Sequence, residues 1–472
     1  MSTKPMATFA RELSIVCALA LGASRCGDVM RAPDGSSSTD GSGPGPDAQS
    51  FDDAATMSRD AGGNAPDAMA PVDVTTPTVD AGAPPSCSAP LAARAIVTDL
   101  SDVMPASCAS FRPPTTSSVL CMRIAGARDG SVRFAYADQR GMVRVLTIDA
   151  LGRRGAGELR TMGEDVRAVY AHEGGDVSVL VKRGIVLALV RFAADGRVLS
   201  DPGVIGTMGM SAEGTRWADN ALRAAAIEQS GANTTYYSSV SGNFGARGIH
   251  QGDQLRHVSP SGMIQAGGWD WGCSHSFELR LATGPMGQAA VCVSDAYPSP
   301  GIVLNNRTVL VPEPAWNPGG GVRRVIVPLL GGVVPDGNGF FLSFASADGR
   351  AARDVAILRF EGTTAATRRW FTTGAANNLA FQPDLMRLGT GMLAYWEWLA
   401  GSEASANLQE LDATGAPVGA PLRLLATDAS HALAFRGGEV PAISIPGGDA
   451  AWVGYRSGTS GPLRLVRVRA CR

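Results

Sequence analysis

A recurring unit of two short apolar segments separated by a tight polar turn is the feature that most constrains the fold of this chain. One copy pairs residues 134–136 with residues 143–149 across a turn at 138–141, and it ends at Gly152. Short segments bounded by turn residues are typical of β-strands. The pattern therefore predicts an all-β protein built from hairpins.

The same unit recurs along the chain after residue 152. The pairs are 177–181 with 185–192, 340–344 with 355–360, 392–398 with 408–412, and 451–455 with 463–468. A degenerate copy ends in residues 255–258. The glycines that close the units are Gly152, Gly196, Gly262, Gly362 and Gly415. Repetition of one supersecondary unit is the signature of a repeat architecture.

The spacing of these glycines indicates which repeat architecture the chain adopts. Successive glycines are 44, 66, 100 and 53 residues apart, and if the third interval holds two units the mean matches a propeller blade. We predict a β-propeller over residues 87–472, with seven blades favoured and six as the alternative count. A pair of β-sandwiches or a β-helix is the alternative fold.

Six cysteines fall within the predicted propeller, and an even number in an exported protein indicates disulfides. They are Cys87, Cys108, Cys121, Cys273, Cys292 and Cys471. Six cysteines allow fifteen pairings. Proximity in sequence favours Cys108–Cys121 and Cys273–Cys292, which leaves Cys87 and Cys471 at the two ends of the domain. A propeller closes by bringing its terminal strands into one blade, so a Cys87–Cys471 bond fits this fold.

The first 26 residues have the layout of a signal peptide. Lys4 and Arg11 precede an apolar stretch at 13–23, and Cys26 follows. The stretch has 11 residues, too few to cross a bilayer as a helix. We therefore expect residues 1–26 to direct export.

Residues 27–86 have the composition of a disordered linker. They contain ten Asp, no Glu or Lys and only two Arg, with few large apolar side chains. Such a segment buries too little apolar surface to offset the entropy of ordering. We predict a flexible acidic spacer, with a processed pro-segment as the alternative.

The end of the signal peptide, Ala23-Ser24-Arg25-Cys26, resembles the lipobox of bacterial lipoproteins, in which the cysteine is acylated. Arg25 departs from the Gly or Ala of that family. The whole chain resembles exported bacterial lipoproteins with an Asp/Ala/Pro-rich stalk and a propeller-like domain of unknown activity. The resemblance implies lipidation of Cys26 and an outer-membrane or cell-surface location. Periplasmic location or secretion is the alternative.

One segment of the predicted propeller is unusually rich in aromatic and polar side chains. It contains Trp269, Trp271, Cys273 and His275, and the segment after Cys292 contributes Asp295 and Tyr297. A Cys273–Cys292 bond would place the two segments side by side. Tryptophans beside polar groups suit stacking of a sugar or peptide. Packing between blades is the competing interpretation for both tryptophans.

Several function classes lack their sequence signals. We find no Gly-x-Ser-x-Gly elbow, His-Glu-x-x-His helix or dinucleotide fingerprint. Residues 87–472 carry 36 basic and 32 acidic residues, which is too small an excess to indicate nucleic-acid binding. Cys273 and His275 with one further cysteine form an incomplete zinc set. We expect no metal, cofactor or nucleic-acid partner.

These observations favour a surface-displayed binding module that recognises a glycan, a peptide or an envelope partner and is not an enzyme. The predicted ligand face contains Trp269, Trp271, His275, Asp295 and Tyr297. A secreted polysaccharide hydrolase or lyase is the first alternative, and it requires catalytic groups that converge at the channel. A structural envelope lipoprotein is the second.

Overall fold

The computed structural model divides into two compact units, Met1–Thr75 and Thr76–Arg472, and every described residue belongs to the second. The described residues are 86, 88–109, 118–184, 186–201, 206–207, 225–243, 249–269, 272–274, 278–295, 297–313, 329–348, 350–374, 378–400, 403–425, 442–454 and 463–471. The predicted signal peptide and all of the predicted linker except Ser86 lie outside these residues.

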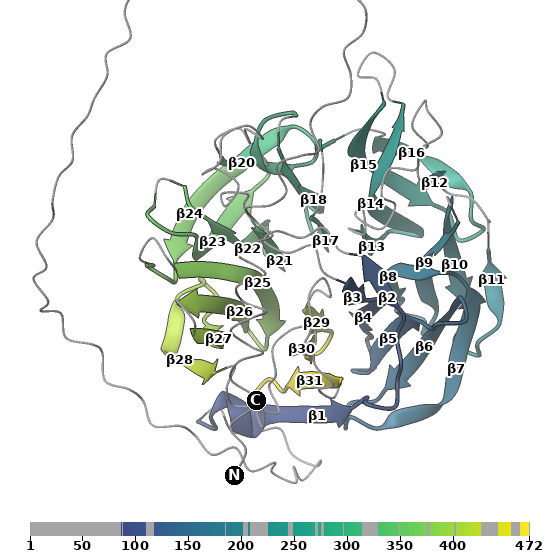
Figure 1. The fold of residues 1–472 in the computed structure, drawn as a ribbon, viewed down its shortest axis with the longest axis horizontal. Coiled ribbons are helices and arrows are strands. Elements are labelled where there is room, and N and C mark those ends of the chain that lie inside the picture. Colours follow the sequence, from purple (N-terminus) through teal and green to yellow (C-terminus); the bar gives the residue numbers. More distant parts are fainter. Residues whose placement is uncertain are drawn as a thin grey trace, which may run out of the picture. The chain divides into compact units, whose positions relative to one another are not determined.

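Seven antiparallel sheets, each with a path of four strands, stand in a ring around a central channel (Figure 1). Each sheet is one blade, and its first strand in the chain is the innermost in six of the seven. The prediction of a seven-bladed all-β propeller is therefore confirmed.

Blades 1 to 3 follow the chain from residue 122 to residue 269. Blade 1 contains β4 (Met122–Gly126), β5 (Val132–Ala137), β6 (Met142–Ile148) and β7 (Arg154–Met162). Blade 2 contains β8 (Asp165–Ala171), β9 (Val177–Arg183), β10 (Val186–Phe192) and β11 (Val198–Ser200), with β12 (Gly206–Thr207) also paired to β10. Blade 3 contains β13 (Ala225–Ser230), β14 (Asn233–Asn243), β15 (Ile249–Val258) and β16 (Ile264–Trp269).

Blades 4 to 6 continue in the same order. Blade 4 contains β17 (Leu279–Gly284), β18 (Gly287–Ser294), β19 (Gly301–Leu304) and β20 (Thr308–Pro312). Blade 5 contains β21 (Leu329–Asp336), β22 (Gly339–Ser346), β23 (Asp354–Glu361) and β24 (Thr364–Trp370). Blade 6 contains β25 (Asn378–Leu388), β26 (Gly391–Ala400), β27 (Glu403–Leu411) and β28 (Pro417–Leu425).

Blade 7 closes the ring with strands from both ends of the propeller. It contains β29 (Ile443–Ile445), β30 (Asp449–Gly454), β31 (Arg464–Val468) and, outermost, β1 (Ala95–Asp99). The β1–β31 ladder is antiparallel and pairs Ala95 with Val468 and Asp99 with Arg464. Figure 1 shows β1 alongside β31 at the closing blade. The predicted meeting of the two ends in one blade is confirmed.

Two short elements lie outside the seven four-stranded paths, one before the closing blade's strand β1 and one beside blade 1. A single 3-10 turn, η1 (Leu91–Arg94), precedes β1, and the hairpin of β2 (Ser107–Ala109) and β3 (Ser118–Leu120) precedes blade 1. No helix among the described residues has the length and apolar character needed to cross a membrane.

The hydrophobic core is divided among the spaces between blades. The described residues form seven buried clusters, and each draws its side chains mainly from two adjacent blades. Trp452 of blade 7 is fully buried against Tyr395 of blade 6, with their ring centroids 6.0 Å apart. Because neighbouring blades bury one another's faces, the ring holds the inner strands around the channel.

Candidate functional site: the central cavity and the disulfide-linked segment

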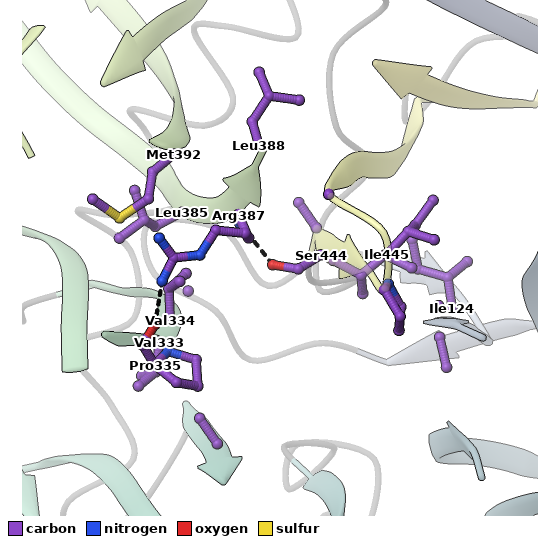
Figure 2. Close-up of a pocket in the computed structure, with 18 of the residues that line it drawn as sticks. Ile124, Val333, Val334, Pro335, Leu385, Arg387, Leu388, Met392, Ser444 and Ile445 are labelled. Atoms are coloured by element: carbon purple, nitrogen blue, oxygen red, sulfur yellow. Dashed lines mark hydrogen bonds between the residues drawn. The ribbon is translucent and has the colours of Figure 1, made fainter. Parts of the chain in front are cut away.

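A cavity of about 1310 Å³ occupies the channel and is lined by the inner strands of all seven blades. Much of its wall is aliphatic, and Figure 2 shows Ile124, Val333, Val334, Leu385 and Leu388 around it. The volume exceeds the range typical of small-molecule sites. The channel is therefore large enough for a small ligand or a short chain segment.

Three arginines of the cavity wall are bound to backbone carbonyls of neighbouring blades. Arg123 Nε donates to Arg167 O at 2.8 Å, and Arg280 Nη2 donates to Leu330 O at 3.0 Å. Arg387 Nη2 donates to Pro335 O, as Figure 2 shows. These guanidinium groups link adjacent inner strands, so part of their hydrogen-bonding capacity serves the ring itself.

Carboxylates make the same kind of link between inner strands. Glu278, just before β17, accepts from the backbone N–H of Leu330 in blade 5. Asp384 Oδ2 accepts from the backbone N–H of Ala442 at 2.7 Å, which joins blade 6 to blade 7. Buried charged groups at these positions are satisfied within the structure and explain how the channel keeps its shape.

Four acids line the cavity, and three of them have partners. Glu410 forms an ion pair with Arg94, and Glu173 pairs with Arg128 at 3.0 Å. The Asp412 carboxylate accepts hydrogen bonds within its own turn, which includes Thr414. Among the described side chains, none donates a hydrogen bond to Glu228 or forms an ion pair with it.

Glu228 lies on β13, the inner strand of blade 3, and is partly buried. Because it lines the cavity, part of its surface is accessible from there. Burial without an opposing charge raises the pKa of the Glu228 carboxyl to about 8. With this pKa the group is mostly protonated at neutral pH.

Tyr170, from the inner strand of blade 2, is the neighbour of Glu228 across the blade boundary. Burial, with a further contribution from the charge of Glu228, raises the pKa of Tyr170 to about 12. Its ring meets the ring of His172 edge-on, with centroids 5.0 Å apart. Burial lowers the pKa of His172, so this imidazole supplies no opposing charge at neutral pH.

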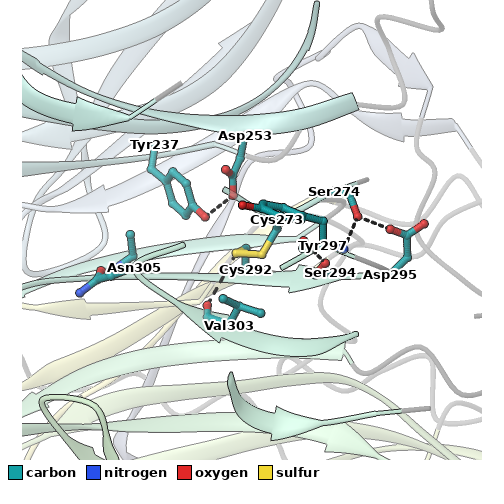
Figure 3. Close-up of a disulfide and its surroundings, with 11 residues drawn as sticks. Tyr237, Asp253, Cys273, Ser274, Cys292, Ser294, Asp295, Tyr297, Val303 and Asn305 are labelled. Carbon is teal, nitrogen blue, oxygen red and sulfur yellow. Dashed lines mark hydrogen bonds between the residues drawn. A yellow bond between two sulfur atoms is a disulfide. The ribbon is translucent and has the colours of Figure 1, made fainter. Parts of the chain in front are cut away.

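The disulfide predicted between Cys273 and Cys292 is present, and it joins the segment after blade 3 to strand β18 of blade 4 (Figure 3). Both cysteines are fully buried. Asp253 also lies here, and one carboxylate oxygen and both sulfur atoms are within 4.8 Å of one another. Because the sulfurs are bonded to each other, they are not available as thiolate metal ligands.

The two segments joined by this bond lie side by side, as predicted for a bonded pair. Ser274 Oγ donates to Asp295 Oδ1 at 2.5 Å, and the backbone N–H of Tyr297 donates to Ser274 Oγ at 2.9 Å. Ser294 Oγ donates to Tyr297 O (Figure 3). The side chain of Asp295 is thus oriented by Ser274, and Tyr297 is 40% exposed.

Trp269, at the end of β16, packs against the cluster between blades 3 and 4. Its ring meets Tyr237 edge-to-face, with centroids 5.9 Å apart. Trp271 and His275 lie outside the described residues. The ligand face predicted from the sequence is thus represented in the structure by Trp269, Asp295 and Tyr297, and its binding role stays a prediction.

Asp253 is a fully buried carboxyl next to the disulfide, and the hydroxyl of Tyr237 donates to it (Figure 3). Burial raises the pKa of Asp253 to about 6, and the hydrogen bond from Tyr237 opposes that shift. A Cβ on Gly272 would lie 2.2 Å from Asp253 Oδ1, so the absence of a side chain at residue 272 makes room for the carboxyl.

For each of the two other predicted disulfides, the structure describes the side chain of only one of the two cysteines. Cys121 and Cys471 are each disulfide-bonded. Cys87 and the side chain of Cys108 lie outside what the structure describes, so the pairings Cys87–Cys471 and Cys108–Cys121 stay predictions. The backbone N–H of Cys121 donates to Ala106 O at 2.8 Å, which places Cys121 near β2 and therefore near Cys108.

The sequence analysis missed Glu228 and Tyr170. A signal was present for Glu228, because it is the one charged residue in the strand at 225–230. Its position at the channel required the ring geometry, which makes β13 the inner strand of blade 3.

No protein-family model matches the chain, and no curated protein matches it. Several solved structures are similar to it at low identity. A candidate 6-phosphogluconolactonase from Bacteroides fragilis is 13% identical, with a TM-score of 0.39 over 66% of this chain and 86% of that one. The propeller domain of the Trilobed protease from Pyrococcus furiosus is 9% identical, with a TM-score of 0.38 over 65% and 84%.

A prolyl endopeptidase structure is also similar, at 10% identity and a TM-score of 0.41. The match covers 74% of this chain and 50% of that protein. At this level of similarity none of these structures indicates what the present chain binds.

Proposed function

We propose that this chain is an exported, surface-displayed binding module whose propeller accepts a ligand in its central cavity. The observation that carries the proposal is the cavity of about 1310 Å³ bounded by inner strands of all seven blades. Its wall combines aliphatic surface with charged and polar side chains, which can orient a bound ligand. A glycan, a peptide or an envelope partner remains the expected class of ligand.

Binding is favoured over hydrolysis by the state of the acids around the cavity. A glycoside hydrolase needs two carboxyl groups that face the scissile bond. Of the four acids that line the cavity, Glu173, Glu410 and Asp412 are engaged by arginines or by their own turn. Glu228 is the only one of the four without a described partner, and one carboxyl does not make that pair.

The proposal includes a role for the N-terminal signal peptide and linker. The apolar stretch at 13–23 and Cys26 support export and lipidation, and the acidic residues 27–86 support a spacer that holds the propeller away from the membrane. Replacing Cys26 with Ser would move the protein from the detergent phase to the aqueous phase in a Triton X-114 partition if Cys26 carries the lipid. An unchanged partition would contradict lipidation at Cys26.

The binding proposal is tested by filling the cavity. Val333 lies on the cavity wall and is partly buried, so Val333→Trp places an indole in the channel. Val198 on the outer strand β11 is 47% exposed, so Val198→Trp is the matched control. The wild-type protein and both variants are applied to glycan and peptide arrays, and their folding is checked by thermal unfolding.

The proposal predicts that ligands retained by the wild type are also retained by Val198→Trp and are lost from a folded Val333→Trp. Equal binding by all three proteins would contradict the cavity as the site, and it would direct attention to Trp269, Asp295 and Tyr297. Failure of the wild type to retain any glycan or peptide would contradict the proposed function for those ligand classes.

A further inference from the structure

We propose that the cavity selects a ligand that carries an organic cation, such as a primary ammonium group, and that Glu228 and Tyr170 bind this cation. The inference rests on the proposed function, because it assigns a ligand class to the same cavity. Three observations support it. Glu228 lines the cavity, Tyr170 lies next to it in the wall, and the charged side chains on the neighbouring strands already have partners of their own.

Glu228 is a cavity-lining carboxyl with no partner among the described side chains. Removing a carboxylate from water without an opposing charge is costly, so natural proteins nearly always pair such groups. Other charged groups at the inner strands follow this rule, as the ion pair of Asp165 with Arg167 at 2.9 Å shows. The exception at Glu228 indicates a place where an external cation completes the pair.

The charged and titratable groups on the elements around Glu228 do not supply that cation. On β17, Arg280 donates to Leu279 O and to Leu330 O, which turns its guanidinium toward blade 5. Arg128, in the turn after β4 of blade 1, pairs with Glu173, which follows β8. His172, also after β8, bonds to Ser178 and is held neutral by burial.

The remaining titratable groups described on the strands near β13 are tyrosines and, on β15, Asp253, Arg256 and His257. On β14, Tyr237 donates to Asp253 of β15, and Tyr236 has its pKa raised by burial, so it stays neutral. Tyr170 of β8 stays neutral for the same reason. Arg256, the cation in this set, hydrogen-bonds Tyr236, which pairs with Ile227 and not with Glu228. His257 bonds to Thr235.

Tyr170 makes an organic cation a better fit than a metal ion. An ammonium group can bind a carboxylate while it contacts the face of a tyrosine ring. Ca²⁺ and Mg²⁺ instead require about six or more oxygen ligands, and a single carboxylate with a phenol does not provide them. The apolar part of the cavity wall on the neighbouring strand β17, which includes Leu281 and Ala282, accommodates the carbon chain that carries the cation.

Isothermal titration calorimetry with n-hexylammonium chloride on the oxidised, full-length protein tests the inference. The probe keeps its charge up to about pH 9, as lysine does. Hexanol and hexanoate are the neutral and anionic probes of equal chain length, and Ca²⁺ tests for a metal site. Glu228→Gln removes the charge at nearly constant volume, and Tyr170→Phe removes the hydroxyl but keeps the ring.

The matched control is Glu361→Gln, which makes the same change at an exposed position at the end of β23, outside the cavity. The inference predicts that hexylammonium binds the wild type and Glu361→Gln equally. Affinity should rise about tenfold per pH unit from pH 6 to pH 7 and level off above pH 8, because the cation displaces the proton of Glu228. Glu228→Gln should bind about tenfold or more weakly at pH 8.5, with no dependence on pH.

Equal affinities of hexylammonium and hexanol, or of wild type and Glu228→Gln, would overturn the cation preference while leaving the cavity as a binding site. Tight binding of Ca²⁺ that is lost in Glu228→Gln would overturn the organic cation in favour of a metal. Absence of binding by hexylammonium at every pH would also overturn the inference. The array experiment with Val333→Trp decides the proposed function separately, since it fills the cavity and leaves Glu228 and Tyr170 unchanged.

Discussion

Two carboxyl groups of blade 3 are removed from water in different ways. Asp253 on β15 is fully buried, but the hydroxyl of Tyr237 donates to it and the Cys273–Cys292 disulfide packs beside it. Glu228 on β13 lies at the channel and has no described partner. The difference teaches that a buried charge alone does not indicate function, because Asp253 is accounted for by packing and hydrogen bonding. Glu228 is the cavity-lining carboxyl without a partner among the residues that the structure describes.

The largest effect is expected at the disulfide that supports Asp253. Cys273→Ala combined with Cys292→Ala opens a loop with a sequence separation of 19 residues, and the chain-entropy model gives a loss of about 3 kcal/mol. The free energy of unfolding in guanidinium chloride checks this value. A loss below about 1 kcal/mol would show that the Asp253 region contributes less to stability than the comparison requires.

The comparison itself is tested by removing each carboxyl. Asp253→Ala leaves the buried Tyr237 hydroxyl without its partner, so we expect a loss of about 2 kcal/mol in the free energy of unfolding at pH 7. Glu228→Ala removes a carboxyl whose burial without an opposing charge costs stability at pH 7, so it should raise that free energy rather than lower it. Equal losses in the two variants would break the distinction between the two sites.

The pH dependence of stability sharpens the comparison at Glu228. The pKa of this group is about 8 in the folded protein and near 4.5 when unfolded, so the folded state holds a proton that the unfolded state loses between these values. Wild-type stability should therefore fall with rising pH across this window, by at most about 1.4 kcal/mol per pH unit. Above about pH 8 the contribution should become constant.

Glu228→Gln removes this titration and is measured beside the wild type by thermal unfolding. Its stability relative to the wild type should increase from pH 5 to pH 8. Parallel curves for the two proteins over this range would contradict an uncompensated carboxyl at the channel.

The smallest effect on stability is expected at the exposed part of the face predicted from the sequence. Tyr297 is 40% exposed, so Tyr297→Ala should change the free energy of unfolding by less than about 0.5 kcal/mol. Array binding by this variant decides whether the face binds ligand. Retained binding would leave the cavity as the favoured site, whereas loss of binding in a folded variant would place ligand recognition near the disulfide.

The hairpin pattern predicted the fold well because it is local. Each pair of segments read from the sequence is the second and third strand of a blade, as in β5–β6, β9–β10 and β22–β23. The closing glycines lie in the turn before the fourth strand with positive φ, for example 79° at Gly152 and 78° at Gly415, a conformation that glycine adopts without strain. Blade 4 had no recognised hairpin and was predicted only from the interval between Gly262 and Gly362.

The candidate site was less predictable because it depends on contacts between blades. The proximity of Cys273 and Cys292 in sequence was enough to predict their bond and the side-by-side arrangement of the two segments, where Ser274 bonds to Asp295. Glu228 and Tyr170 are far apart in sequence and belong to different blades. Their proximity follows from the curvature of the ring, and no local pattern contains that information.

The central claim is that Glu228, which has no partner among the described residues, forms an ion pair with a cationic ligand. The most direct measurement is the pKa of Glu228 by carbon-13 NMR of the glutamate carboxyls, assigned by comparison with Glu228→Gln, with and without hexylammonium. The account predicts a pKa near 8 in the free protein and a clear decrease when the probe is bound. An ordinary pKa near 4.5 in the free protein, or a pKa that the probe leaves unchanged, would contradict it.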